Sequence, residues 1–99
     1  MQEITETIQK INAEFNAKGI TPHAINNGLC EDFAMMVIEQ MGGYSSELEE
    51  VATESFNGTD DLPGHVWIYY QDKFYDAECP QGVKDWRELP IFKRLRGNA

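Results

Sequence analysis

The first stretch of the chain alternates apolar and polar residues with helical spacing. The apolar positions, four, three and four residues apart, are Ile4, Ile8, Ile11 and Phe15. This spacing places them on one face of a helix, which we predict over residues 2–18. Gly19 follows where a helix commonly ends, so we expect a loop of about ten residues next.

A second amphipathic stretch begins at Leu29 and ends before Gly42 and Gly43. Its apolar positions are Leu29, Phe33, Met36, Val37 and Met41. The segment just before it, Asn26-Asn27-Gly28, contains residues that favour turns and helix caps. The pattern therefore predicts a tight turn that leads into a helix with a cysteine on its first turn.

The clearest strand signal is a pair of aromatic and β-branched runs, His65 to Tyr70 and Phe74 to Glu78. They lie on either side of Gln71-Asp72-Lys73, so they predict an antiparallel hairpin. Another strand is predicted over residues 50–56, and residues 57–64 read as an exposed loop because turn residues dominate them.

Residues 44–62 allow one alternative to that strand. Ser46 and Glu49 have the spacing of a capping box, which would begin a helix there. After the hairpin, residues 85–89 predict a short helical turn that Pro90 stops. The apolar residues of this last segment, expected to pack back on the core, are Trp86, Leu89, Ile91 and Phe92.

Together these elements predict an α+β fold in one domain, residues 1–99, with the cysteine helix packed on a small antiparallel sheet and the N-terminal helix beside it. The net charge is −9. Residues 1–83 hold fifteen acids and three bases, whereas residues 84–99 hold two acids and five bases. An acidic body argues against nucleic-acid binding, which needs a basic face. The basic end is interpreted as solvated, with an acidic partner or the protein's own acidic face as alternatives.

The chain shows no basic-then-apolar leader and no apolar run of the roughly 18–20 residues that would cross a bilayer. We therefore expect a cytoplasmic protein without a membrane partner. Its two cysteines, Cys30 and Cys79, do not form a disulfide framework and are expected to be free in a reducing compartment. The oligomeric state is left open.

The register of the hairpin decides which carboxylate lies near His65. Side chains alternate along a strand, so a loop of two residues, Gln71-Asp72, makes Asp76 the diagonal neighbour of His65, as does a loop of four. A loop of three residues would instead present Tyr75 on that face. Glu78 shares the side of Asp76 and is the reserve candidate.

Cys30, His65 and Asp76 are a suitable set for acyl chemistry. A thiol at a helix N-terminus favours the thiolate, and His65 would accept its proton. Asp76 would hold the imidazole ring and stabilise its charged form. The N–H of Cys30, with the side-chain amide of Asn27, would bind the developing oxyanion. No cofactor and no metal are needed for this chemistry.

Three other interpretations compete with this one. Cys30 could be a small buried apolar residue, and His65 a structural histidine. Cys30 and Cys79 could form a disulfide if the hairpin brought them together. Cys30, Cys79, His23 and His65 could bind zinc, although their spacing lacks the paired ligands typical of such sites.

The residues Gly28, Cys30, Phe33 and Ala34 resemble the nucleophile motif of the transglutaminase-like and papain-like cysteine protease superfamily. In the transglutaminase-like members, the cysteine helix precedes a strand, then a strand that begins with histidine, often His-x-Trp, then a strand that carries aspartate. Residues 26–80 hold Cys30, the strand predicted near Val51, His65-Val66-Trp67 and Asp76 in that order. Gly64 to Trp67, Tyr75 to Glu78 and Trp86 to Pro90 also resemble small uncharacterised phage-encoded proteins.

The resemblance implies a minimal cysteine hydrolase or acyltransferase. It would form a thioester with the carbonyl of an amide, such as a glutamine side chain, in a peptide or protein substrate, and water or an amine would resolve it. The alternative, from another functional class, is a catalytically silent, acidic binding or inhibitor protein on the same scaffold.

Overall fold

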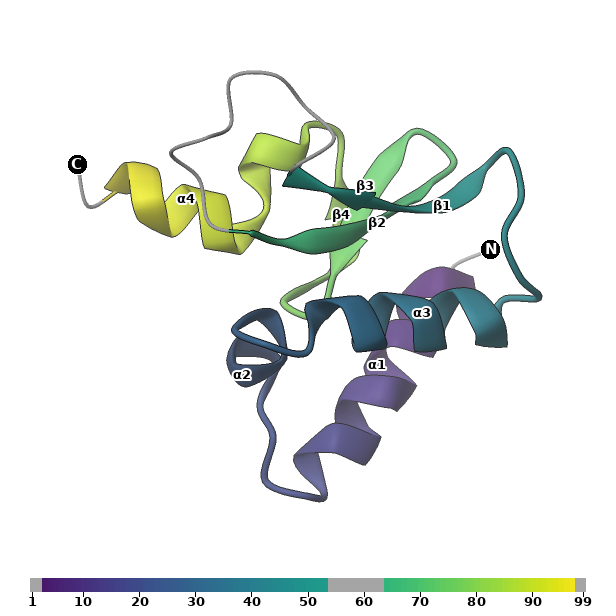
Figure 1. Cartoon of the computed structure of the whole chain (residues 1–99), viewed down its shortest axis with the longest axis horizontal. Helices are drawn as coiled ribbons and strands as arrows, with labels where there is room; N and C mark the ends of the chain where they lie inside the picture. Colours follow the sequence, from purple (N-terminus) through teal and green to yellow (C-terminus); the bar gives the residue numbers. More distant parts are fainter. Residues whose placement is uncertain (1–2, 54–63, 98–99) are drawn as a thin grey trace.

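A computed structural model of the chain describes residues 3–53 and 64–97. The described elements, in chain order, are α1 (Glu3–Asn16), α2 (Pro22–Asn26), α3 (Cys30–Gln40), β1 (Leu48–Ala52), β2 (Val66–Tyr70), β3 (Lys73–Asp76), β4 (Cys79–Val83), the 3₁₀ helix η2 (Trp86–Glu88) and α4 (Pro90–Gly97). The strands form one antiparallel sheet in the order β1-β2-β3-β4 (Figure 1). The predicted α+β class, with a cysteine helix on an antiparallel sheet, is therefore confirmed.

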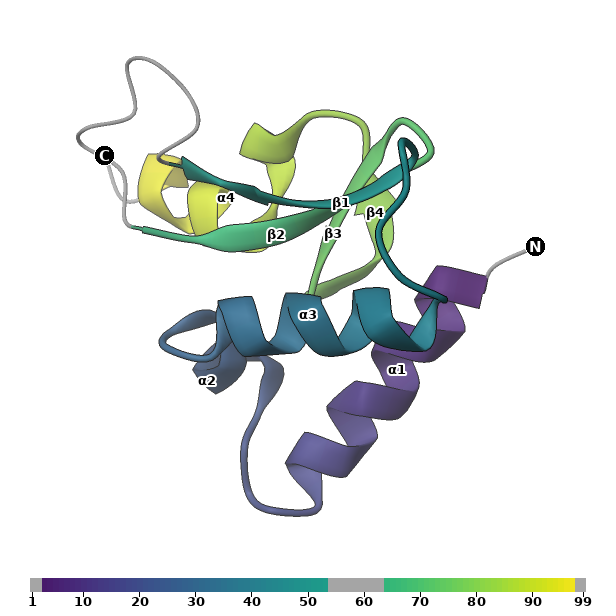
Figure 2. The ribbon, with the colours of Figure 1, turned by 45° about the vertical axis from the view of Figure 1, so that its right-hand side comes forward.

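The sheet buries apolar side chains on both of its faces. Helices α1, α2 and α3 lie on one side, and η2 and α4 lie on the other (Figure 2). The residues buried beneath α1 and α3 include Ile8, Ile11, Phe33, Val37, Ile68 and Tyr75. Those buried beneath α4 are Trp67, Leu89, Ile91 and Phe92. Neighbouring residues of β2 thus point into different cores, which is the expected alternation of a strand.

Helix α1 forms close to the predicted bounds. The structure differs from the prediction in the segment before α3 and in the segment after it. The predicted loop after Gly19 contains α2, because Thr21 and Pro22 begin a helix instead of only following one. The Oγ1 atom of Thr21 accepts a hydrogen bond from the N–H of Ala24 at 3.2 Å, and Pro22 takes the first helical position. The predicted strand over 50–56 begins earlier, at Leu48, and its residues 54–56 lie outside the described part.

The capping-box alternative at Ser46 and Glu49 is wrong, because β1 pairs with β2 from Leu48 onward. The predicted loop over 57–64 lies outside the described residues except for Gly64. At the other end of the chain, the short turn forms as η2. Pro90, however, begins α4 rather than ending a helix, which corrects the prediction.

The hairpin between β2 and β3 has the two-residue loop Gln71-Asp72. Tyr70 pairs with Lys73, and both loop residues have positive φ, 46° and 68°. Positive φ at both central positions is typical of a type I′ turn, whose twist suits an antiparallel pair. The alternatives of three or four loop residues are therefore wrong, and the register that places Asp76 beside His65 is confirmed.

Strand β4 was not predicted from the sequence. It contains Pro80 and Gly82, both uncommon inside strands, but it is an edge strand, where they are tolerated. Gly82 has a φ of +79°, and a Cβ added there would lie 2.6 Å from Cε2 of Tyr75. The tyrosine ring therefore packs directly over the backbone of Gly82.

Gly82→Ala is expected to lower the free energy of unfolding by about 2–3 kcal/mol, because it adds both a clash with Tyr75 and an unfavourable φ. Urea denaturation measures the change. Gly42→Ala is the matched control, since Gly42 also has a positive φ, +106°, but nothing lies within 4 Å of its added Cβ. Equal losses for the two variants would show that the contact with Tyr75 does not matter.

Within residues 3–53 and 64–97, no helix has the length and apolar character needed to cross a membrane.

Candidate active site

Cys30 is the first residue of α3 and is half-buried. The N–H groups of a first helical turn have no partner within the helix, so they point toward this end. The helix is capped by Leu29 without a side-chain hydrogen bond, which corrects the expectation that the segment Asn26-Asn27-Gly28 supplies the cap. Glu31 and Asp32 also belong to the first turn, and both are exposed to solvent.

His65 lies immediately before β2 and is almost completely buried, with 1% of its surface exposed. Thr53, just after β1, holds its backbone from both sides. The N–H of His65 donates to Oγ1 of Thr53 at 3.1 Å, and the N–H of Thr53 donates to the carbonyl of His65 at 3.1 Å. The position of the imidazole is thus tied to the end of the sheet.

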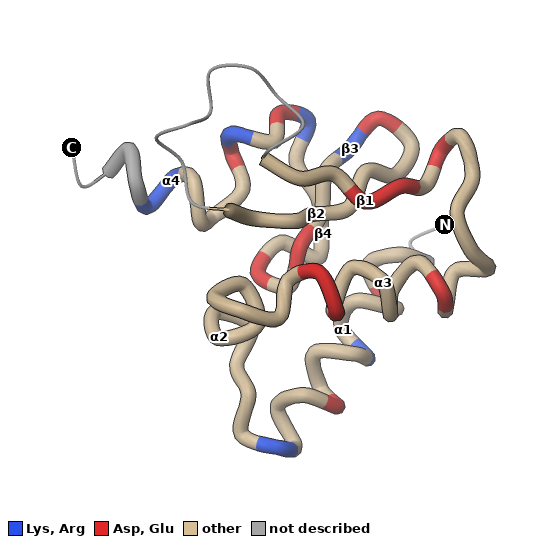
Figure 3. Tube along the Cα trace, viewed as in Figure 1, with Lys and Arg blue, Asp and Glu red and all other residues tan. Residues whose placement is uncertain are grey.

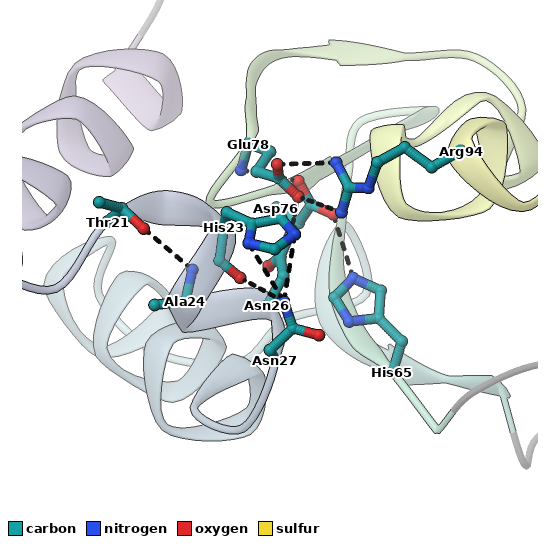
Figure 4. A network of polar contacts seen from close by, with 9 residues as sticks. All are labelled: Thr21, His23, Ala24, Asn26, Asn27, His65, Asp76, Glu78 and Arg94. Carbon is teal, nitrogen blue, oxygen red and sulfur yellow. Dashed lines mark hydrogen bonds and ion pairs between the residues drawn. The ribbon is translucent and has the colours of Figure 1, made fainter.

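Asp76 braces the ring of His65. Its Oδ2 atom lies 3.0 Å from Nε2 of His65, and its side chain is 2% exposed (Figure 4). Oδ1 of Asp76 accepts the N–H of Glu78 at 3.0 Å. The carboxylate therefore uses one oxygen for the ring and the other for the turn after β3, which fixes its orientation.

The second ring nitrogen of His65, Nδ1, is buried and makes no hydrogen bond of ordinary length to any described residue. His65 and Cys30 line the same pocket, which has a volume of about 390 Å³. Since Asp76 occupies Nε2, Nδ1 is the nitrogen left to exchange a proton with the thiol.

The surroundings shift both titrating groups toward their charged forms. Polar interaction with His65 lowers the pKa of Cys30 from its ordinary value; burial opposes this, and the N–H groups of Val66 and Glu31 add to it. Burial alone would lower the pKa of His65, but Asp76 and Cys30 outweigh it and raise that pKa to about 9. The arrangement thus favours a thiolate–imidazolium pair.

Aromatic side chains enclose the imidazole. The ring centroid of His65 lies 5.9 Å from that of Trp67 and 5.8 Å from that of Phe92, which meets it edge-on. Trp86 stacks on Trp67 at 5.4 Å and continues this wall. Ile91 of α4 lines the pocket itself. A low-dielectric wall of this kind strengthens the interaction of His65 with Asp76.

Glu78, the reserve candidate, faces other partners. Its carboxylate accepts hydrogen bonds from Arg94 of α4 at 2.9 and 3.0 Å and from Nδ2 of Asn26 at 2.8 Å (Figure 4). Arg94 lowers the pKa of Glu78, although burial acts in the opposite direction and is the larger single influence. The network joins α2, α4 and the turn after β3 around the site. It also shows that part of the basic end contacts the protein's own acidic residues.

Asn27, predicted as an oxyanion donor, lines the pocket but its amide faces α2. Its Nδ2 atom donates to the carbonyl of His23 at 2.9 Å and lies 3.4 Å from the His23 ring nitrogens. In this conformation the Asn27 amide is bonded to α2 and does not point into the pocket as a donor. Of the two predicted oxyanion donors, the N–H of Cys30 at the N-terminus of α3 remains.

The competing cysteine interpretations find no geometric support. Cys30 and Cys79 are free thiols. Among the described residues, no three His, Cys, Asp or Glu side chains lie close enough to hold a metal ion, so Cys30, Cys79, His23 and His65 are not assembled into a zinc site.

Sequence reasoning missed three contributors to the site: Asn26, Thr53 and Ile91. Asn26 was seen only as a turn residue, although it is 3% exposed and bonded to Glu78. Thr53 and Ile91 reach the site from distant elements, so no local pattern marks them.

In comparisons with known proteins, no family model, curated protein or solved structure matches this chain.

Proposed function

We propose that the protein is a minimal cysteine hydrolase or acyltransferase of the transglutaminase-like type, in which Cys30 is the nucleophile, His65 the base and Asp76 the orienting carboxylate. The observation that carries this proposal is the placement of His65. One of its ring nitrogens is bonded to the buried Asp76, and the other is left toward the pocket that Cys30 lines. The chain order of helix, strand, histidine strand and aspartate strand supports the same scaffold.

The reaction follows from the protonation states of the pair. The Cys30 thiolate attacks the carbonyl carbon of an amide, forming a C–S bond, while the oxyanion turns toward the N–H of Cys30. Imidazolium His65 then donates its proton to the leaving nitrogen as the C–N bond breaks. Water or an amine loses a proton to His65, attacks the thioester and releases the Cys30 sulfur. The site needs no cofactor for these steps.

The test is the pH dependence of alkylation of Cys30 by iodoacetamide, followed by mass spectrometry of the peptide that contains it. Cys30 is expected to react at pH 6 at least about tenfold faster than a free thiol, whose pKa is about 8.5. Cys79 is the internal control, because burial and the nearby Asp76 raise the pKa of its thiol. A profile for Cys30 that matches an ordinary thiol would leave the silent binding protein as the better interpretation.

A further inference from the structure

A second hollow of the surface, a groove of about 660 Å³, lies beside α3. The described residues that line it differ from those that line the Cys30 pocket. Its lining includes Met35, which is 49% exposed, and Tyr44, which is 60% exposed; among the described residues, these are the large apolar side chains left exposed. Apolar side chains that gather in one exposed groove are typical of a binding surface, and methionine adapts its shape to a partner.

One face of α3 gives the groove an alternation of charge and apolar surface. The groove-lining residues on that face are Asp32, Met35, Met36 and Glu39. Their spacing of i, i+3, i+4 and i+7 aligns them along the helix, while another face of α3 packs into the core. Positions seven residues apart lie about 10 Å apart along the axis. The groove therefore presents two methionines between two carboxylates.

Tyr44 forms a wall of the groove because the chain reverses after α3. Gly42 and Gly43 both have positive φ, +106° and +105°, which turns the chain there. The hydroxyl of Tyr44 donates a hydrogen bond to Oε1 of Glu50 in β1 at 3.2 Å. Partial burial of the hydroxyl and the carboxylates of Glu50 and Glu31 raise the pKa of Tyr44. Two further carboxylates thus lie near this wall.

The groove has no positive charge of its own to balance these acids. Residues 19–72, which include α3, Tyr44 and β1, contain no lysine or arginine, and Figure 3 shows red but no blue along α3. The ion pairs within residues 3–53 and 64–97 involve Asp76, Asp85 and Glu78, so Asp32 and Glu39 have none there. An anionic bilayer or nucleic acid would be repelled, and a cationic partner attracted.

We propose that this groove docks a segment of a partner protein in which a large apolar side chain lies between two lysine or arginine residues. The apolar side chain packs against Met35, Met36 and Tyr44, and the basic side chains pair with Asp32 and Glu39. This goes beyond the proposed function, because docking here needs no reactive thiol.

The basic end of a second copy of this chain is a poorer occupant. Its Arg94 is bonded to Glu78, and its Phe92 is 2% exposed, packed on Trp67 and Trp86. Both would have to leave these contacts before they could enter the groove. A separate partner protein pays no such cost.

The experiment follows the ¹³C-labelled methionine methyl groups of the protein by NMR at low ionic strength. The probe is a synthetic peptide, blocked at both ends, in which one tryptophan lies between two lysines. The methyl signals of Met35 and Met36 are expected to shift in a saturable manner. Met41 is the internal control, because it lines a separate polar hollow with Glu6 and Lys10, and its signal is expected to stay in place. Peptides with glutamate for lysine, or alanine for tryptophan, should bind at least about fivefold more weakly.

Charge-removing variants test the two carboxylates. Asp32→Asn and Glu39→Gln are each expected to weaken binding of the lysine peptide about threefold. Glu6→Gln, the matched control, removes an exposed carboxylate outside the groove and should change it less than about 1.5-fold.

A weaker affinity in Asp32→Asn and Glu39→Gln alone supports the docking site. It is overturned if no saturable shift occurs, if the glutamate peptide binds equally well, or if Glu6→Gln acts as strongly. It is also overturned if sedimentation shows a dimer whose formation moves the Met35 and Met36 signals, since the occupant would then be a second copy. The alkylation profile of Cys30 is measured separately, so none of these results decides the proposed function.

Discussion

His65→Gln is expected to slow alkylation of Cys30 at pH 6 by at least about tenfold, and to return its pH profile to that of a free thiol. Interaction with His65 is the largest influence that lowers the pKa of Cys30. Glutamine fills much of the same space and can still bond to Asp76, but it cannot carry a positive charge. The rate is measured with iodoacetamide across the pH range, on the Cys30 peptide.

His23→Gln is the matched control for this variant, because His23 is exposed on α2 and is bonded to Asn27 rather than to the thiol. Its alkylation profile is expected to match that of the unmodified protein. Because His65 is buried, near-UV circular dichroism of the stacked Trp67 and Trp86 reports whether the variant is folded. A folded His65→Gln protein with an unchanged profile would contradict the proposed base.

Asp76→Ala is expected to act on both stability and reactivity. It leaves Nε2 of the buried His65 without its acceptor, which typically costs about 3–5 kcal/mol of unfolding free energy. Cys30 alone then opposes the effect of burial, so the pKa of His65 should fall from about 9. NMR titration of the imidazole protons of His65 and urea denaturation measure the two effects.

Two further variants test the charge of Asp76 and the role of the neighbouring Glu78 separately. Asp76→Asn keeps an acceptor for the ring but removes the charge. The pKa of His65 in this variant should therefore lie between its values in the unmodified protein and in Asp76→Ala. Glu78→Ala removes the neighbouring carboxylate, which is bonded to Arg94 and Asn26 instead of His65, and should leave the rate at Cys30 within about twofold. If Glu78→Ala slowed the reaction of Cys30 and the Asp76 variants did not, the orienting carboxylate would be Glu78 and the assignment to Asp76 would be wrong.

The hairpin was predictable because it depends on local sequence, whereas its register was left open. Two aromatic runs fix the strands, and the parity of the residues between them decides which side chains share a face. Gln71 and Asp72 are not favoured in a type I′ turn, so their residue types alone did not fix the loop length. The pairing of Tyr70 with Lys73 fixes it, and Asp76 meets His65 as a consequence.

The elements that were missed depend on tertiary packing rather than on local preference. Pro80 and Gly82 argue against a strand, yet β4 forms because Tyr75 packs over Gly82 and an edge strand tolerates proline. Pro90 was interpreted as a helix stop but begins α4, because proline suits the first position of a helix as well as the position after one. Asn27 had the right chemistry for an oxyanion donor, but a backbone carbonyl one turn earlier holds its amide.

The acidity of Cys30 depends on groups that only folding brings to it, because His65 and Val66 lie at least 35 positions further along the chain. A copy that loses its tertiary structure therefore carries an unremarkable cysteine. If the proposed chemistry holds, damaged molecules cannot attack amides indiscriminately in their surroundings. The reactive thiol is then present only in molecules that also have the folded pocket around it.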